Sequence, residues 1–145
     1  MSVLFTIGFV GKKARDFFEL LAQNDVRTLI DVRLKNASQL AGYTKKDDLE
    51  YFLEKICGIH YTHAICLAPT ASILSDYKKK IITWAEYEKK YTQLMQMRNL
   101  KKNLGGMDFD RACLLCSEKT PEHCHRRLAA AHLKLLGYVN DIMHL

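Results

Sequence analysis

The sequence contains no apolar run that approaches the roughly 20 residues of a membrane-spanning helix. Its start lacks the charged segment, apolar middle and small-residue cleavage site of a secretory signal peptide. The five cysteines are odd in number, so they cannot all pair within one chain. Free thiols or ligands are their expected state in a reducing compartment. We therefore expect a cytoplasmic protein without a membrane partner.

The length and composition are those of an ordinary globular domain. At 145 residues the chain can bury a core without disulfides or metal, and 48% hydrophobic and 26% charged residues fit that class. We expect one α/β domain over residues 1–145. The 22 basic and 16 acidic side chains give a net charge of +6, which favours anionic partners without choosing among nucleic acid, nucleotide and small anion.

Short β-rich runs alternate along the chain with segments of helical periodicity. The expected strands are Val3–Ile7, Val26–Val32, Ile59–His63, Arg111–Leu115 and Tyr138–Leu145. The expected helices are Ala14–Leu21, Thr44–Ile56, Asp76–Leu100 and a last one from near Glu122–His125 to Gly137, with loops over Ala64–Ser75 and Lys101–Asp110. This alternation predicts a single-domain three-layer α/β fold with a mainly parallel sheet and helices on both faces.

Two segments have the spacing of a helix capping box, in which an N-cap hydroxyl and an acidic side chain three residues later satisfy each other's backbone N–H groups. One pairs Thr44 with Asp47, and the other pairs Thr83 with Glu86. Glycines beside a strand end permit close approach of backbones, and Gly8 and Gly11 follow the first expected strand. Their spacing matches no phosphate-loop fingerprint.

The densest group of reactive side chains follows the fourth expected strand. Cys116 and Glu118 lie where that strand should end, and Cys124, His125 and Arg126 lie at the expected helix start. A strand–loop–helix turn directs side chains and backbone N–H groups to the carboxyl edge of a parallel sheet, where ligands bind. Cys116 or Cys124 is the candidate nucleophile, because a helix N-terminus and a guanidinium both stabilise a thiolate. His125 or Glu118 is the candidate proton carrier, and Arg126 is a candidate anion ligand.

A second group lies at the tips of two other expected strands. Asp31 and Arg33 are two residues apart, so they share one face of a strand. Either they form a structural ion pair, or Asp31 orients Arg33 to bind an anion. Tyr61 and His63 also share a face and reach the same edge, or they are a core tyrosine and a hydrogen-bonded histidine.

Two alternatives to a thiol nucleophile remain for the turn at Cys116. Cys116, Cys124 and His125, with His123 or His63 as a further ligand, offer soft metal ligands, but their spacing matches no regular zinc motif, and adjacent Cys124 and His125 would project in different directions on a helix. We therefore predict no metal ligands and no cofactor. In the other alternative the thiols only pack, while Arg33, Arg126 and the helix N-terminus bind phosphate.

Four segments together resemble domain-of-unknown-function family 488. They are Thr-Ile-Gly8, Ile-Asp-Val-Arg33, Gly-Ile-His-Tyr61 and Leu-Leu-Cys-Ser-Glu-Lys-Thr-Pro-Glu-His-Cys-His-Arg126, and the similarity runs from about Thr6 to Leu136. The resemblance implies a compact α/β domain without a settled activity. Carried over by position, it marks the site candidates Asp31, Arg33, Tyr61, Cys116, Glu118, Cys124, His125 and Arg126. The sequence departs from the family at Leu67-Ala-Pro-Thr70, where a Leu-Gly pair is usual.

Leu-Ile-Asp-Val-Arg33, Leu-Leu-Cys116 and the segment from Leu128 to Tyr138 look like rhodanese-type domains, in which a cysteine after a strand carries persulfide sulfur. The usual loop closes with an arginine soon after the cysteine, whereas Arg126 follows Cys116 by ten positions. The hypothesis is an enzyme of sulfur- or phosphate-group chemistry with an anion-binding thiol pocket, acting on a small anion or nucleotide. The alternative is a nucleotide- or nucleic-acid-binding module without catalysis. The sequence does not fix the oligomeric state.

Overall fold

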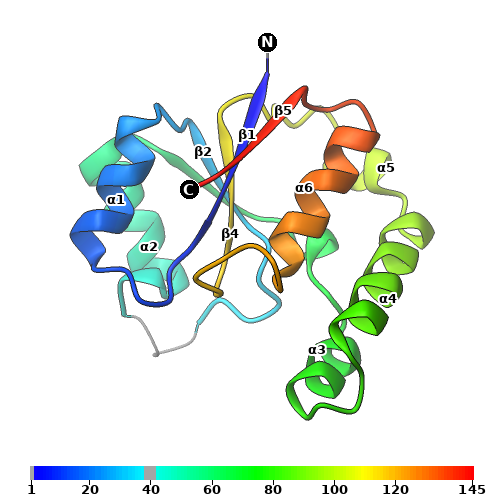
Figure 1. Cartoon of the computed structure of the whole chain (residues 1–145). Coiled ribbons are helices and arrows are strands. Elements are labelled where there is room, and N and C mark those ends of the chain that lie inside the picture. The colour runs from blue at the N-terminus through cyan, green and yellow to red at the C-terminus, as the bar shows by residue number, and fades with distance from the viewer. Residues whose placement is uncertain (1, 38–41) are drawn as a thin grey trace.

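A computed structural model describes residues 2–37 and 42–145, in which five strands form one sheet (Figure 1). Its strands are β1 (Val3–Gly8), β2 (Thr28–Asp31), β3 (His60–His63), β4 (Ala112–Cys116) and β5 (Asp141–His144). Their order across the sheet is β3-β2-β4-β1-β5, and every pairing in the described part of the chain is parallel. The carboxyl ends of all five strands therefore lie at one edge of the sheet.

Helices cover both faces of this sheet (Figure 1). One face carries α1 (Ala14–Gln23) and α2 (Lys46–Phe52), and the other carries α3 (Ala71–Lys78), α4 (Trp84–Met97), α5 (Leu100–Leu104) and α6 (His125–Leu135). Short turns of 3₁₀ or π helix occupy Gly42–Thr44, Leu53–Cys57 and Ile65–Leu67. The predicted three-layer α/β class is confirmed. Within residues 2–37 and 42–145, no helix has the length and apolarity needed to cross a membrane.

Side-chain alternation along β4 decides which face carries the Cys116 thiol. Cys113 and Leu115 pack in the core beneath α1 and α2, while Leu114 and Cys116 pack beneath α4 and α6. Since Gly8 of β1 lies opposite Cys116 in the parallel register, β1 brings its own end to the same point.

The region between β3 and β4 differs from the prediction. The expected loop over Ala64–Ser75 already contains the start of α3, because the Thr70 hydroxyl accepts the Ile73 N–H at 3.2 Å and caps that helix. The expected single helix over Asp76–Leu100 is split, since Lys80 adopts a positive φ of 60° before α4 begins. α5 begins at Leu100, the last residue of that expected helix, and continues into the expected connector over Lys101–Asp110.

Candidate functional site

The turn from β4 to α6 brings two thiols and an imidazole together. Cys116 is the last residue of β4, Cys124 is the N-cap of α6 and His125 is its first residue. Their ligand atoms all lie within 4.8 Å of one another, and all three residues are buried. Cys124 has extended backbone angles (φ −135°, ψ 136°), so it and His125 both face Cys116. The expectation that these neighbours would diverge as on a helix is wrong, because Cys124 precedes the helix.

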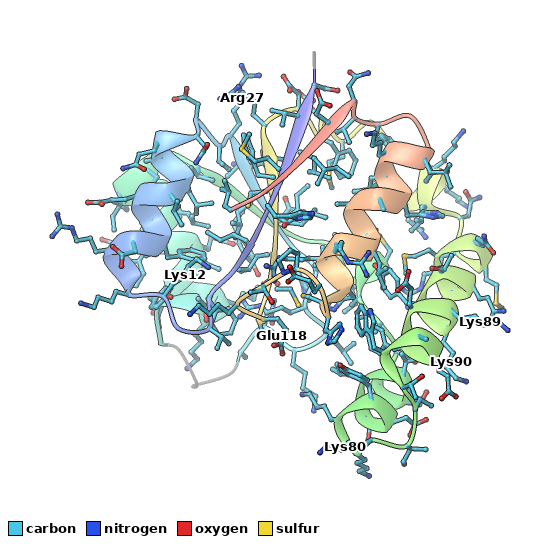
Figure 2. All side chains as sticks on the ribbon, in the orientation of Figure 1. Lys12, Arg27, Lys80, Lys89, Lys90 and Glu118 are labelled. Carbon is cyan, nitrogen blue, oxygen red and sulfur yellow. The ribbon has the colours of Figure 1, made fainter. Side chains whose placement is uncertain are left out.

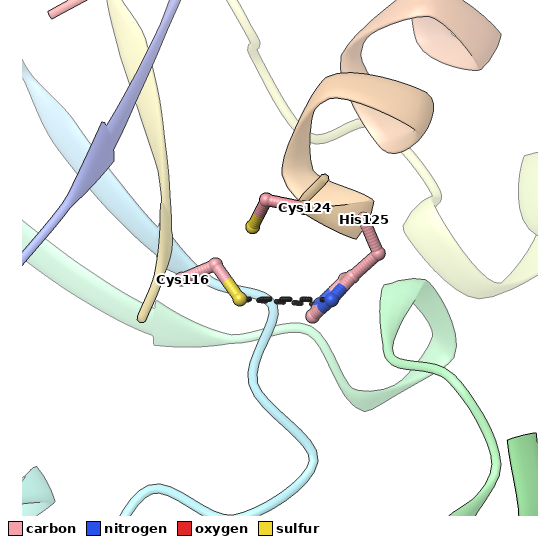
Figure 3. Close-up of side chains that lie close together, drawn as sticks. All are labelled: Cys116, Cys124 and His125. Atoms are coloured by element: carbon pink, nitrogen blue, oxygen red, sulfur yellow. Dashed lines mark hydrogen bonds between the residues drawn. The ribbon is translucent and has the colours of Figure 1, made fainter. Parts of the chain in front are cut away.

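The imidazole of His125 lies beside the Cys116 thiol (Figure 3). The Cys116 sulfur is 3.6 Å from Nδ1 and 3.7 Å from Nε2 of His125. Nε2 is also 2.7 Å from the Val32 carbonyl oxygen, which only accepts, so Nε2 carries the hydrogen and Nδ1 is the free acceptor in the neutral ring. Burial lowers the pKa of His125 below its usual range, which keeps the ring neutral near pH 7.

The two thiols of the cluster differ in acidity. The pKa of Cys116 is lowered, and the largest cause is a hydrogen bond from Cys124. A hydrogen bond from the Ser117 backbone and the charge of Arg126 lower it further, while burial acts in the opposite direction. The same hydrogen bond and burial raise the pKa of Cys124. Cys116 is therefore the thiol that ionises first. Burial raises the pKa of Cys113, on the other face of β4.

Arg126 lies fully buried one residue after the histidine. Its Nη1 donates to the Glu118 carbonyl at 2.6 Å and its Nε donates to the Thr6 hydroxyl at 3.3 Å. Its Nη2 has no hydrogen-bond partner among the residues that the structure describes. Gly8 makes this packing possible, because a Cβ on it would lie 2.8 Å from Nη1. Arg126 thus places a buried positive charge near the thiols.

Glu118 contributes to the site differently from the sequence-based prediction. Its backbone carbonyl accepts the hydrogen bond from Arg126, while its side chain is exposed and lines the cavity beside the cluster. Figure 2 shows Glu118 beside the loop between β4 and α6, at the same end of the molecule as Lys80.

Asp31, Arg33 and Tyr61 form a buried network at the ends of β2 and β3. Asp31 accepts hydrogen bonds from Arg33 Nε at 2.9 Å, from Arg33 Nη2 at 2.8 Å and from the Tyr61 hydroxyl at 2.7 Å. Burial and the bond to Asp31 raise the pKa of Tyr61. The structural ion pair is therefore present, and Arg33 also lines the cavity. His63 lies outside the cluster, with Nε2 2.8 Å from the Arg33 carbonyl oxygen.

A cavity of about 820 Å³ adjoins the cluster and includes Cys116, Cys124 and His125 in its lining. Segments far apart in the sequence supply its other walls, including the cations Lys35, Lys78 and Lys80 and the aromatic residues Phe9, Tyr77, Tyr87 and His123. Trp84 supports this wall, since its ring lies 4.8 Å from that of Tyr87 and 5.1 Å from that of His123. No sequence motif joins these aromatic residues of α3 and α4 to Cys116.

The fold and the site define an α/β protein with a buried thiol–imidazole cluster at the carboxyl edge of a parallel sheet. Residues 13–133 match the family model described as Domain of unknown function DUF488, and the chain belongs to this family. This confirms the family resemblance drawn from the sequence motifs. No curated protein and no solved structure gives a significant match. The rhodanese-type resemblance stays a prediction.

Proposed function

We propose that the protein is a thiol enzyme that transfers a sulfur- or phosphate-containing group through Cys116. The observation that carries this proposal is the 3.6 Å separation between the Cys116 sulfur and His125 Nδ1 beside a cavity. Nδ1 accepts the thiol proton as the sulfur attacks an electrophilic sulfur or phosphorus atom of the substrate. The leaving group then receives that proton, and a second acceptor later removes the group from Cys116.

Cations around the cavity suit an anionic substrate. Lys35, Lys78 and Lys80 line the cavity, and Arg126 places a buried charge near the cluster. In this proposal Arg33 and Arg126 bind the negatively charged group of the substrate. Asp31 and Tyr61 hold Arg33 in place through the hydrogen bonds given above. Glu118 at the cavity wall would carry a proton to or from solvent. We assign the activity to one cytoplasmic domain over residues 1–145.

A nucleotide-binding module without catalysis is the second candidate. The cavity wall formed by Tyr77 and Tyr87 offers aromatic rings beside Lys78 and Lys80, which suits a base joined to phosphate. In this function the thiols only pack. It predicts oligonucleotide or nucleotide binding that weakens steeply with salt and survives replacement of both Cys116 and Cys124 by serine.

The test of the thiol enzyme is the alkylation rate of each cysteine against pH, read by peptide mass with and without sulfate or phosphate. We expect Cys116 to react at a pH below the roughly 8.5 of an ordinary thiol and to be protected by the anion. Cys113 serves as an internal control, because burial raises its pKa. A Cys116 that reacts like an ordinary or buried thiol would exclude the nucleophile. If Cys116 instead reacts at low pH and is protected, persulfide and phosphoryl donors are tested for mass adducts on it.

A further inference from the structure

The cluster at the β4–α6 turn contains three soft metal ligands rather than a single thiol with its base. We propose that Cys116, Cys124 and His125 together bind one soft divalent cation such as Zn²⁺, with one coordination position open to the cavity. This inference goes beyond the proposed function and does not depend on it, because it needs the positions of the three ligand atoms and no reactivity of Cys116.

The separation between the Cys116 sulfur and the His125 nitrogen matches that of a tetrahedral zinc site. Zinc bonds of about 2.3 Å to sulfur and about 2.0–2.1 Å to nitrogen place a sulfur and a nitrogen about 3.6 Å apart at the tetrahedral angle. The Cys116 sulfur and His125 Nδ1 are 3.6 Å apart. Two sulfurs on the same ion lie about 3.8 Å apart, and all three ligand atoms here lie within 4.8 Å of one another. Coordination therefore requires the other ligand atoms to close to these separations by side-chain rotation.

The second shell also suits a metal ligand. A histidine that binds metal commonly donates its other ring N–H to a carbonyl or carboxylate, which fixes the tautomer and the ring orientation. His125 has this arrangement, since Nε2 lies 2.7 Å from the Val32 carbonyl and Nδ1 is left for the ion. The extended N-cap backbone of Cys124 allows two adjacent residues to serve as ligands, which a helical backbone would prevent.

Charge and access complete the site. Two thiolates neutralise a divalent cation, so the loaded cluster adds no net charge to a buried region that already contains Arg126. Three protein ligands and an open position are the pattern of catalytic rather than structural zinc sites. The cavity offers that position to water or substrate, and exposed His123 and Glu118 line it. A bound ion is coordinated by the Cys116 sulfur, which is then not free to react. The metal-bound form and the free-thiol form are therefore alternative states of the protein.

The test is titration of the reduced, metal-free full-length protein with Co²⁺, followed by displacement with Zn²⁺. We expect a thiolate-to-cobalt charge-transfer band that saturates at one equivalent and disappears when Zn²⁺ is added. Cys124→Ser and His125→Asn should each weaken Co²⁺ binding at least about tenfold, whereas the matched control Cys66→Ser, at a half-buried thiol outside the cluster, should leave it unchanged. Absence of the band, or a band of unchanged intensity and affinity in Cys116→Ser, would overturn the proposal.

A second measurement needs no variant and covers the case in which a substitution prevents folding. Wild-type protein is alkylated with and without Zn²⁺, and each cysteine is read by peptide mass. Zinc should protect Cys116 and Cys124 while the half-buried Cys57 and Cys66 react as before. Equal rates with and without Zn²⁺ contradict the metal site. The metal-free rate at Cys116 separately decides the proposed function, so either idea can fail while the other stands.

Discussion

Gly8 is the position where a single methyl group should disturb both the fold and the site. It ends β1 opposite Cys116, and the loop after β4 crosses directly over it. A Cβ at Gly8 would lie 1.6 Å from the carbonyl oxygen of Glu118 and 2.8 Å from Arg126 Nη1. The nearest atoms belong to backbone, which cannot rotate away as a flexible side chain can. Gly8→Ala therefore forces either the loop or the end of β1 to move.

The required movement sets the expected magnitude. Real Cβ contacts essentially never fall below 3.0 Å, so the Glu118 carbonyl must retreat by at least about 1.4 Å from its 1.6 Å position. Overpacking of a buried site typically costs about 1–3 kcal/mol, and we expect Gly8→Ala to lie near 3 kcal/mol because Arg126 also loses its 2.6 Å bond to Glu118. The displaced guanidinium should in turn raise the pKa of Cys116, since its charge helps to lower it.

The assay combines urea unfolding with the pH dependence of Cys116 alkylation. Gly106→Ala is the matched control, because a Cβ there meets nothing within 4 Å, and we expect it to change the unfolding free energy by less than about 0.5 kcal/mol. A Gly8→Ala protein with the stability of Gly106→Ala and an unchanged Cys116 profile would refute the argument that this close approach positions the turn.

Three further predictions concern other interactions. Cys124→Ala removes the hydrogen bond that most lowers the pKa of Cys116, so the Cys116 alkylation profile should move to higher pH; an unmoved profile contradicts this assignment. Burial lowers the pKa of His125, so the unfolding free energy should fall as the pH drops below about 6.5. Urea titrations across pH measure this fall, and His125→Asn should flatten it. Thr83→Ala removes the N-cap of α4 and should lower the unfolding free energy by about 1 kcal/mol, whereas an unchanged thermal or urea midpoint would show that the cap is dispensable.

The fold was largely predictable from local pattern. Each of the five expected strands overlaps an observed one. The apolar, largely buried runs of β1, β2 and β4 differ clearly from the helical stripes between them, whereas β3 and β5 are partly exposed. Ala14, Phe17, Phe18 and Leu21 recur at helical spacing, which predicts a core-facing stripe on α1; the last three are buried, whereas Ala14 at the helix start is exposed. The capping box at Thr83 is confirmed, since the Thr83 side chain accepts from the Glu86 backbone N–H and the Glu86 side chain accepts from the Thr83 backbone N–H. The box predicted at Thr44 is wrong, since Lys45 is the N-cap of α2 and makes no side-chain cap bond.

The site was predictable in part. The motif around Cys116 identified the turn, because reactive residues at a strand end and a helix start lie at the ligand-binding edge of a parallel sheet. The direction in which the Cys124 side chain points depends on the backbone angles of that one residue. Helical periodicity in the sequence does not specify those angles. The cavity walls at Tyr77 and Lys80 come from α3 and the turn after it, and only tertiary packing brings that segment to Cys116.

The most direct test of the central claim is the ultraviolet absorbance of thiolate against pH, measured for the wild type and for Cys116→Ser. The hydrogen bond from Cys124 and the charge of Arg126 lower the pKa of Cys116. The difference between the two titrations should therefore contain one thiolate with a midpoint below about 8.5. A difference that titrates at or above that value would show that Cys116 is an ordinary thiol and would contradict the account.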